Sequence, residues 1–475
     1  MKAAEQSELL APKTGFSALS KGDLIKWIVT FLVPLIIWLI PMPFDDNIKM
    51  FIVITAWGVT SWIVTVIPVA VTGALLPSMY LFFGVTGAEV AYGAWTNTVI
   101  WLTVAVILIG LAADKSKVSL RLAYKILLKL DCSLRGLIWS FSIAGIFLAF
   151  IITDNMARCI VFLTIAIGVC QALGIKAKSK EATALCLAGF FAMSGPSIGT
   201  LTAGNGLYFN SVFREVAGYD ITYFQWMLHN FIPALAWTFF GVISIIKVLK
   251  IGKEKTYDAK SELQRCYNEL GPVKRREVFV FVYLLMVVVT VILSGTYGFD
   301  PMLVVAMFLF LMFLPGIDIL SVDDFDKADF KILFVMTGAI SIGNVAGSVG
   351  LIDVLVEYVT PLLTGSPVRM VFGSYIFSTL ANFILTPLAI VFTFTELFTE
   401  MAIAAGVNPL PVIYALNLGS DVYVFPYEYA ILLIAYSFGY MNYTDTVKVL
   451  LARTILSVLV MAVFMIPLWF LMGLL

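Results

Sequence analysis

The sequence has few charged residues for its length and no excess of either sign. Of its 475 residues, 13% are charged and 61% are hydrophobic, whereas an ordinary soluble domain has roughly 25% charged residues. Basic and acidic residues are equal in number, so nothing indicates a nucleic-acid partner. So much apolar sequence exceeds what a soluble core can bury, and it predicts an all-α polytopic membrane protein.

Side chains that carry catalysis are also scarce. His229 is the sole histidine, and the five cysteines form no CxxC pair and have no metal-ligand spacing. The HExxH and GxSxG motifs are absent as well. A membrane-embedded enzyme would need a nucleophile with its base or a metal cluster, so we expect no enzyme, no catalytic residue, no metal and no organic cofactor.

The N-terminal region lacks a signal peptide. Residues 1–23 are polar and have neither an apolar core nor a small-residue cleavage site, so we expect the first apolar segment to be retained. Lysine and arginine cluster before that segment and again at 115–135, 176–180 and 247–276, and these sides should be cytoplasmic. We expect an inner cell membrane location, an odd number of crossings, a cytoplasmic N-terminus and an external C-terminus.

Apolar segments long enough to cross a bilayer, or broken into shorter pieces, fill both halves of the chain. A polar stretch, 250–276, separates the halves, and a basic amphipathic stretch at 116–133 is predicted to lie on the membrane surface. The apolar segments are 24–42, 49–84, 96–114, 136–152, 156–174, 182–201, 206–226 and 229–249, then 277–295, 300–316, 331–349, 351–364, 369–392, 396–407, 410–425, 427–443 and 446–475.

The apolar runs are interrupted at matching places in the two halves. In the first half, polar and helix-breaking residues occur at 152–158 and 194–206; in the second they occur at 378–387 and 417–429. Irregular backbone at membrane depth is tolerated where it lines a cavity, and paired interruptions point to a transporter site. The alternative is that single Gly, Pro and Asn residues serve helix packing.

These interruptions resemble those of the divalent anion:sodium symporter family of di- and tricarboxylate transporters. Members carry a Ser-Asn-Thr tripeptide at a hairpin tip in each half, where this chain has Asp154-Asn155-Met156 and Ala381-Asn382-Phe383. Ser197–Thr200 with Asn205 resembles the family's second loop, and Pro426 with GYMNYTD at 439–445 resembles its counterpart. The resemblance covers nearly the whole chain.

The resemblance implies an inverted-repeat transporter with re-entrant hairpins and broken helices. It implies a homodimer in which a transport domain moves like an elevator against a scaffold. The expected divisions are a cytoplasmic tail (1–23), first-half scaffold helices (24–95), a first transport repeat (96–249), a cytoplasmic linker (250–276), second-half scaffold helices (277–329) and a second transport repeat with the C-terminal helix (330–475).

Arg158 is the most informative single residue. It lies in an apolar run, three positions after Asn155 and thus on the same helix face. An arginine at the bilayer centre costs at least ~2.5–3.5 kcal/mol, and a bound anion would relieve that cost. We predict that Arg158 supplies fixed positive charge where sodium-coupled relatives bind a cation. The alternative is an intrahelical Asp154–Arg158 pair, with Asp154 also capping the helix.

The second half places acids where the first half places a base. Asp421 and Glu428 could bind a proton or cation, pair with Arg158, or lie solvated at an outer interface. Asp154 and Asp421 are predicted for cation binding or charge balance. The residues predicted for substrate binding are Asn155, Arg158, Ser197, Gly199, Thr200, Asn205, Thr379, Asn382, Pro426 and Glu428.

The predicted function is secondary transport of small carboxylates. The class is C4-dicarboxylates or 2-oxoglutarate, carried by anion exchange; the alternative is sodium- or proton-coupled symport. Sodium stays open because both tripeptides lack the flanking hydroxyls that help family members hold it. Expected partners are small carboxylate anions, the lipid bilayer and a second copy of the chain. A channel is disfavoured because repeated breaks at one depth indicate alternating access.

Overall fold

A computed structural model describes residues 21–64, 66–96, 98–252, 259–297, 299, 301–328, 330–351, 366–383 and 385–475. Within these ranges every regular element is a helix, as the composition predicts. The predicted tail lies outside them up to residue 20, as does the predicted segment 351–364 apart from Leu351.

The first half of the chain contains the helical elements α2 to α12. Its elements are α2 (Lys21–Leu39), α3 (Asp46–Val64), α4 (Val69–Phe82), α5 (Ala88–Ala91), η2 (Gly93–Thr96), α6 (Thr98–Ser116), α7 (Val118–Leu127), α8 (Leu134–Ala149), α9 (Asn155–Ala172), α10 (Lys180–Ile198), α11 (Gly206–Val212), the π-helical turn η3 (Phe213–Ala217) and α12 (Tyr223–Val248).

The linker between the halves contains α13 (Lys260–Glu269). The second half follows a similar order. Its elements are α14 (Arg275–Tyr297), α15 (Pro301–Phe308), η4 (Leu309–Phe313), α16 (Asp323–Lys327), α17 (Lys331–Ser348), α19 (Pro367–Ala381), α20 (Pro387–Ala404), α21 (Pro409–Ser420), η5 (Pro426–Glu428), α22 (Ala430–Ser437), α23 (Tyr443–Leu459), the π-helical turn η6 (Val460–Met465) and α24 (Ile466–Leu471).

Among the described residues, seven helical stretches are long and apolar enough to cross a membrane, in agreement with the predicted polytopic membrane protein. They are 22–39, 155–172, 223–248, 275–294, 331–348, 387–404 and 443–471.

Three predicted segments differ from the structure. The run at 206–226 is divided, because Gly218 adopts a left-handed φ of 74° and Thr222 caps a new helix through a capping box with Gln225. The segment at 396–407 is largely the end of α20 rather than an element of its own. The amphipathic stretch at 116–133 forms only α7, and its buried face packs against α8, α9, α13 and α14.

The same motif occurs once in each half. A two-helix hairpin (α8–α9 or α19–α20) packs against a broken helix (α10–α11 or α21–α22), and a long helix follows. The hairpin asparagines Asn155 and Asn382 are 227 residues apart, the same interval that separates Ser194 from Asp421. These are the repeats with hairpins and broken helices that the matching interruptions predict.

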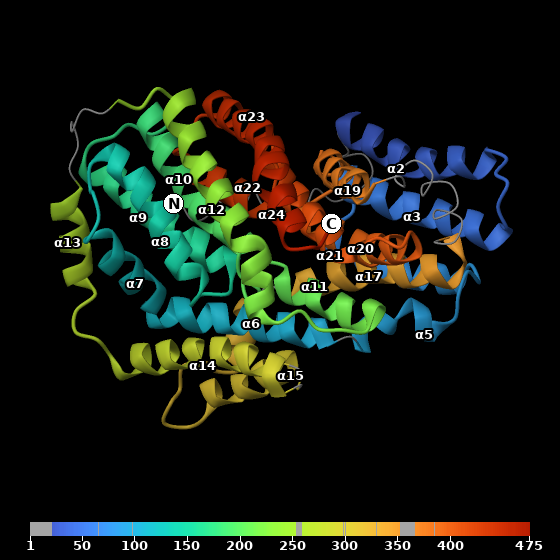
Figure 1. The fold of residues 1–475 in the computed structure, drawn as a ribbon, viewed down its shortest axis with the longest axis horizontal. Coiled ribbons are helices and arrows are strands. Elements are labelled where there is room, and N and C mark those ends of the chain that lie inside the picture. The colour runs from blue at the N-terminus through green and yellow to red at the C-terminus, as the bar shows by residue number, and fades with distance from the viewer. Residues whose placement is uncertain are drawn as a thin grey trace.

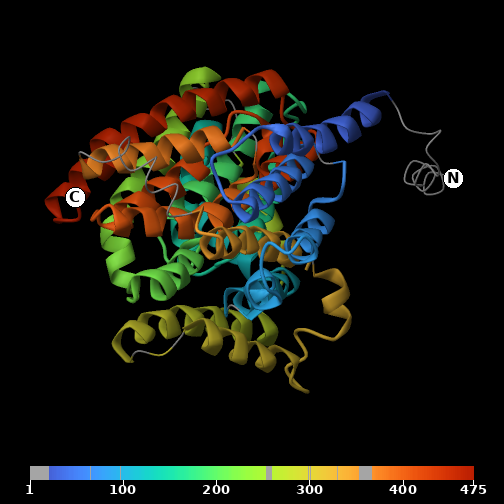
Figure 2. The same cartoon turned by 90° about the vertical axis from the view of Figure 1, so that its right-hand side faces the viewer.

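The helices form a main group with a thinner layer along one edge. In both views α14 and α15 run along that edge beside α6, while α2 lies with α3 on another side (Figures 1 and 2). Helix α4 of the first half crosses α17 of the second at two glycines. A Cβ built on Gly338 would lie 2.6 Å from the Cα of Gly73, so this crossing requires both residues to lack side chains.

A buried ion pair joins α7 to the start of α14. Nε of Arg121 lies 2.5 Å from Glu277 Oε2, and both side chains are almost fully buried. A second guanidinium nitrogen donates to the backbone oxygen of Gly271 at 3.0 Å. Nearby, Lys117 begins α7 with a left-handed φ of 61°. The bend between α6 and α7 is therefore anchored to the second half by side-chain contacts.

Replacing Arg121 by leucine should lower the free energy of unfolding by about 3 kcal/mol, because Glu277 would remain as an unpaired buried carboxylate. Thermal unfolding of the purified protein in detergent would measure the loss. Arg265 on α13 provides a matched control, since it is 59% exposed and pairs with Glu262 at the surface. Equal effects of Arg121→Leu and Arg265→Leu would contradict a stabilising role for the buried pair.

Candidate functional site

The ends of six helical segments meet at one pocket. Helices α9 and α20 begin there, α10 and α21 end there, and the loops before α11 and α22 complete the wall. The pocket has an empty volume of about 370 Å³, its mouth included. Its lining residues are Asn155, Ser194, Ser197, Ile198, Gly204, Asn205, Pro387, Leu388, Asn417, Ser420, Asp421, Tyr423 and Tyr429. Both halves of the chain therefore build the same site.

Local sequence explains why two long helices begin at the pocket. The Asp154 carboxylate accepts a hydrogen bond from the backbone N–H of Ala157 at 2.6 Å and caps α9. In the second half Thr386 caps α20, and Pro387 occupies the first helical position, where its fixed φ is favourable. The N-terminus of an α-helix carries unpaired N–H groups and a positive dipole end, which favour a bound anion.

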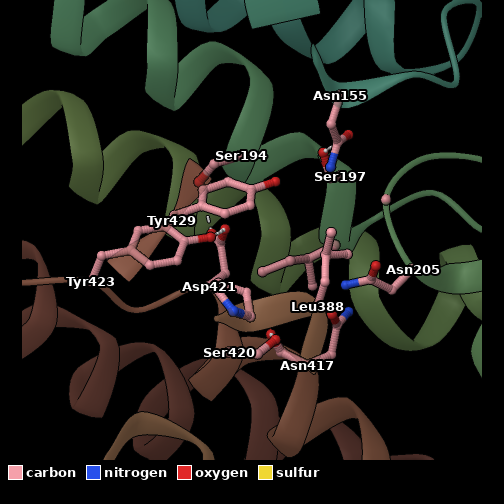
Figure 3. A pocket seen from close by; sticks show the side chains of 13 residues that line it. Asn155, Ser194, Ser197, Asn205, Leu388, Asn417, Ser420, Asp421, Tyr423 and Tyr429 are labelled. Atoms are coloured by element: carbon pink, nitrogen blue, oxygen red, sulfur yellow. Dashed lines mark hydrogen bonds between the residues drawn. The ribbon is translucent and has the colours of Figure 1, made fainter. Parts of the chain in front are cut away.

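The loop between α10 and α11 passes very close to the first hairpin. Gly204 has a left-handed φ of 64°, and a Cβ built on it would lie 3.2 Å from the Cβ of Ser197 and 3.6 Å from Asn155 Nδ2. Only glycine combines that backbone conformation with so close an approach. The glycine brings Asn205 to the pocket wall, near Asn417 (Figure 3).

Arg158 lies directly behind the pocket wall and is fully buried. Its guanidinium donates to Asn155 Oδ1 and, at 2.7 Å, to Ser197 Oγ. The single proton of Ser197 Oγ has two acceptors within reach, the Met193 backbone oxygen at 2.6 Å and Asn155 Oδ1 at 3.0 Å. Two other guanidinium nitrogens, Nε and Nη1, have no hydrogen-bond partner among the described residues. The arrangement places a positive charge one side chain away from the cavity.

The predicted alternative, an ion pair between Asp154 and Arg158, is absent from the ion pairs of the described residues. Asp154 caps α9 instead, as the same alternative also predicted. No other carboxylate takes its place, so Arg158 is a buried cation without an ion-pair partner in the part of the chain described. In a low-dielectric interior such a charge interacts strongly with any anion nearby.

Asp421 is the acidic group of the pocket, and it has several donors. Its Oδ2 accepts from Ser194 Oγ at 2.7 Å, from Trp237 Nε1 at 2.6 Å and from Arg453 Nη2 at 3.3 Å. Its Oδ1 accepts from the Tyr423 hydroxyl at 2.5 Å. The predicted alternative in which Asp421 pairs with Arg158 is wrong, because its arginine partner is Arg453 of α23.

One wall of the pocket is aromatic. The rings of Tyr423 and Tyr429 stack with centroids 5.0 Å apart and planes 13° from parallel. Figure 3 shows both rings beside Asp421, with Asn155 and Ser197 at one end of the pocket and Asn417 and Ser420 at the other. The pocket thus has polar groups at two ends, and between them lie the Leu388 side chain and the Asp421 carboxylate with its two tyrosines.

The structure brings four of the predicted residues to the pocket wall, namely Asn155, Ser197, Asn205 and Asp421. Arg158 contacts two of these from behind. The remaining predicted residues, Asp154, Gly199, Thr200, Thr379, Asn382, Pro426 and Glu428, do not line it.

The side chains of two of these second-half residues form hydrogen bonds with backbone groups instead. Asn382 Nδ2 donates to the backbone oxygens of Gly419, Ser420 and Val422 at 2.8 to 3.1 Å, and so braces the end of α21 from behind. The Glu428 carboxylate accepts from the backbone N–H groups of Val424 and Phe425. Glu428 is 2% exposed, so it is not solvated at an outer interface.

The first-half residues that miss the pocket are explained by packing. Gly199 ends α10 where a Cβ would lie 2.8 Å from that of Ala234, and Thr200 is buried and lines a separate small cavity with Ala234 and Thr238 of α12.

Trp237 and Arg453 contribute to the site but were not predicted. Arg453 falls in the C-terminal apolar run, and an ionisable residue in a membrane segment is a candidate functional residue by default, so that signal was available. Trp237 gave no such signal, because it is one of ten tryptophans in an apolar chain.

Comparison with known proteins agrees with the family resemblance that the sequence predicts. The family described as "Sodium:sulfate symporter transmembrane region" matches residues 21–475. The chain is 25% identical over 293 residues to "Putative malate transporter YflS" of Bacillus subtilis (strain 168), covering 59% of this chain and 60% of that protein. It is 26% identical over 260 residues to "Sodium-dependent dicarboxylate transporter SdcS" of Staphylococcus saprophyticus, covering 52% and 49% respectively. The chain therefore spans about half to three-fifths of the length of these relatives.

Proposed function

This chain belongs to the family of the sodium:sulfate symporter transmembrane region, and we propose that it exchanges small dicarboxylate anions across a membrane. The family and the two relatives are named for transport, and none of the names describes an enzyme. The proposed substrates are of the C4-dicarboxylate or 2-oxoglutarate class.

The observation that carries the proposal is the buried guanidinium of Arg158 behind Asn155 and Ser197. Arg158 has no ion-pair partner among the described residues, and its side chain contacts two groups that line the pocket. The starts of α9 and α20 add positive dipole ends at the same place. An anion in the pocket would interact favourably with all three.

The shape of the pocket supports a short anion with two polar ends. Asn155 and Ser197 lie across the pocket from Asn417 and Ser420, with Leu388 between them (Figure 3). The side-chain N–H groups of Asn155 and Asn417 can donate hydrogen bonds to a carboxylate at each end, whereas the hydroxyl protons of Ser197 and Ser420 are taken by neighbouring protein oxygens. The names of the two relatives, which mention malate and dicarboxylates, agree with this class.

The charge of the empty site favours the exchange of one anion for another over the one-way transport of a single anion. An empty carrier would have to move the unpaired charge of Arg158 through a low-dielectric interior, which is costly. A bound dianion offsets that charge. The carrier should therefore change orientation readily only when an anion is bound, and each inward crossing should be coupled to an outward one.

Sodium- or proton-coupled symport is the second candidate, favoured by the name of the relative SdcS. The contacts of the three predicted acids argue against it. Asp154 caps α9, Asp421 pairs with Arg453, and Glu428 accepts two backbone N–H groups. A coupling cation would have to compete with donors that these carboxylates already hold.

Uptake of labelled succinate or 2-oxoglutarate into proteoliposomes would test the proposal. We expect uptake into vesicles preloaded with unlabelled dicarboxylate to exceed uptake into empty vesicles at least about tenfold, with no response to a sodium gradient or a pH gradient. Protein-free vesicles are the control. Sodium- or proton-driven uptake into empty vesicles would establish symport and contradict exchange, and no uptake under any condition would exclude this substrate class.

The assembly predicted from the family resemblance remains part of the proposal. It comprises a homodimer, an elevator-like movement between the predicted scaffold and transport segments, and an inner cell membrane location with a cytoplasmic N-terminus and an external C-terminus. Cross-linking in membranes and cysteine accessibility on each side would test these points.

A further inference from the structure

An acidic side chain in the wall of an anion pocket requires an explanation, since a free carboxylate would repel the substrate. We propose that Arg453 is a positioning residue that neutralises Asp421 and so sets the charge that the pocket offers to a substrate. The inference rests on the proposed function, because it concerns the same pocket.

Arg453 is built into the interior rather than placed at the pocket. Its side chain is 2% exposed, whereas that of Asp421 is 14% exposed. The guanidinium carbon lies 3.8 Å from the ring centroid of Trp237 and 4.2 Å from that of Phe191. Two aromatic faces stabilise a cation held between them, and its planar group suits such stacking.

The side chain at position 241 must be absent for this arrangement. A Cβ built on Gly241 would lie 3.0 Å from the Phe191 ring and 3.5 Å from Arg453 Nε. The glycine therefore leaves room for the arginine and the ring together. Arg453 Nε and Nη1 have no hydrogen-bond partner among the described residues, so the carboxylate of Asp421 is its ion-pair partner in that part of the chain.

The groups that face Asp421 come from every element packed around it. Arg453 is the cation, from α23, and Ser194 of α10 and Trp237 of α12 are neutral donors. Two phenols complete the set: Tyr423 donates to Oδ1, and Tyr429 stacks on the Tyr423 ring beside the carboxylate (Figure 3). The Asp421 carboxylate and the Arg453 guanidinium cancel one another in charge. Arg158 is the remaining cation of the site, and Asp154, which caps α9 four residues before it, is the remaining acid.

The pair also connects the two broken helices. Arg453 Nη2 donates to Ser194 Oγ at 2.8 Å as well as to Asp421. Ser194 lies in the last turns of α10, and Asp421 immediately follows α21. One guanidinium nitrogen therefore holds together the two segments that carry the pocket wall.

Four purified proteins would test the role of the pair: wild type, Arg453→Gln, Asp421→Asn and the double variant. Affinities for succinate and for its monoamide, succinamate, would be measured by protection against thermal unfolding in detergent. We expect Arg453→Gln to weaken succinate binding at least about tenfold and to reduce the preference for succinate over succinamate, because the pocket gains an unpaired negative charge. Asp421→Asn should bind succinate at least as tightly as wild type, and the double variant should return to within about threefold of it.

Thermal midpoints without ligand provide a readout that does not depend on transport. Each single variant should unfold at a lower temperature, and the double variant should recover at least about half of the loss, because no buried charge is left unpaired. Arg276→Gln, at an exposed site on α14, is the matched control and should change neither readout. Additive losses in the double variant would overturn the proposal. Wild-type protein that binds neither probe would instead contradict the proposed function, while the midpoints would still show whether the two charges compensate.

Discussion

Exchange of labelled dicarboxylate should fall by about two orders of magnitude when Arg158 is replaced by glutamine, a loss of about 2.7 kcal/mol. Glutamine can keep a hydrogen bond to Ser197 or Asn155 but removes the positive charge that the site offers to an anion. Initial rates of counterflow into preloaded proteoliposomes would measure the change, at equal amounts of reconstituted protein.

Arg158→Lys should retain part of the activity. Lysine keeps the charge, but its shorter side chain and compact ammonium do not reproduce the position of Nη2, the one guanidinium nitrogen that donates to both Asn155 and Ser197. Arg276→Gln removes an exposed arginine from α14 and should exchange at the wild-type rate. Near-normal exchange by Arg158→Gln would show that the positive charge is unnecessary, and the case for exchange made from it would fail.

The second large effect concerns folding. Replacing Gly145 by valine should prevent recovery of folded protein or destabilise it by at least about 3 kcal/mol. A Cβ on Gly145 of α8 would lie 2.7 Å from the carbonyl carbon of Ala192 in α10, and closer still to its oxygen. Because the obstacle is backbone rather than a flexible side chain, the hairpin would have to move away from the broken helix.

Gel filtration and thermal unfolding in detergent would measure this loss. Gly168→Ala in α9 is the matched control, since no atom lies within 4 Å of an added Cβ there. Alanine should be neutral or should stabilise by up to about 1 kcal/mol, because it favours the helix over the unfolded chain. If the Gly145 and Gly168 variants were equally stable, the close approach of α8 to α10 would be wrong.

The two predictions concern different properties of the same region. Gly145 lets α8 lie against α10 closely enough to position the hairpin, and the hairpin then presents Asn155 and Arg158 to the pocket. In the corresponding helix of the second half, α20, the residue four positions after the cap is Ile390, where α9 carries Arg158. The site therefore has one cation behind one hairpin, and the repeats are alike in shape but not in charge.

Much of the architecture could be predicted from the sequence, because it depends on short segments. Hydropathy over about 20 residues identifies spanning helices, and the all-helical membrane fold and the family resemblance are both confirmed. Local breakers such as Asp154, Gly204 and Pro387 set where helices begin and end, so the breaks in the two halves were also predictable. Arg158 stood out because an unpaired charge in an apolar run is costly wherever it packs.

Only the tertiary structure decided which polar groups of the broken segments contact one another. Asp421 and Glu428 looked equivalent in the sequence, yet one lines the pocket beside Arg453 and the other turns back to its own backbone. Asn155 and Asn382 lie in corresponding tripeptides of the sequence, yet Asn155 begins α9 and faces the cavity, whereas Asn382 ends α19 and braces the end of α21. The physical reason is that hydropathy and helix capping act within a few turns of chain, whereas the hydrogen bond from Arg453 to Ser194 joins residues 259 positions apart and depends on how α10, α21 and α23 pack together.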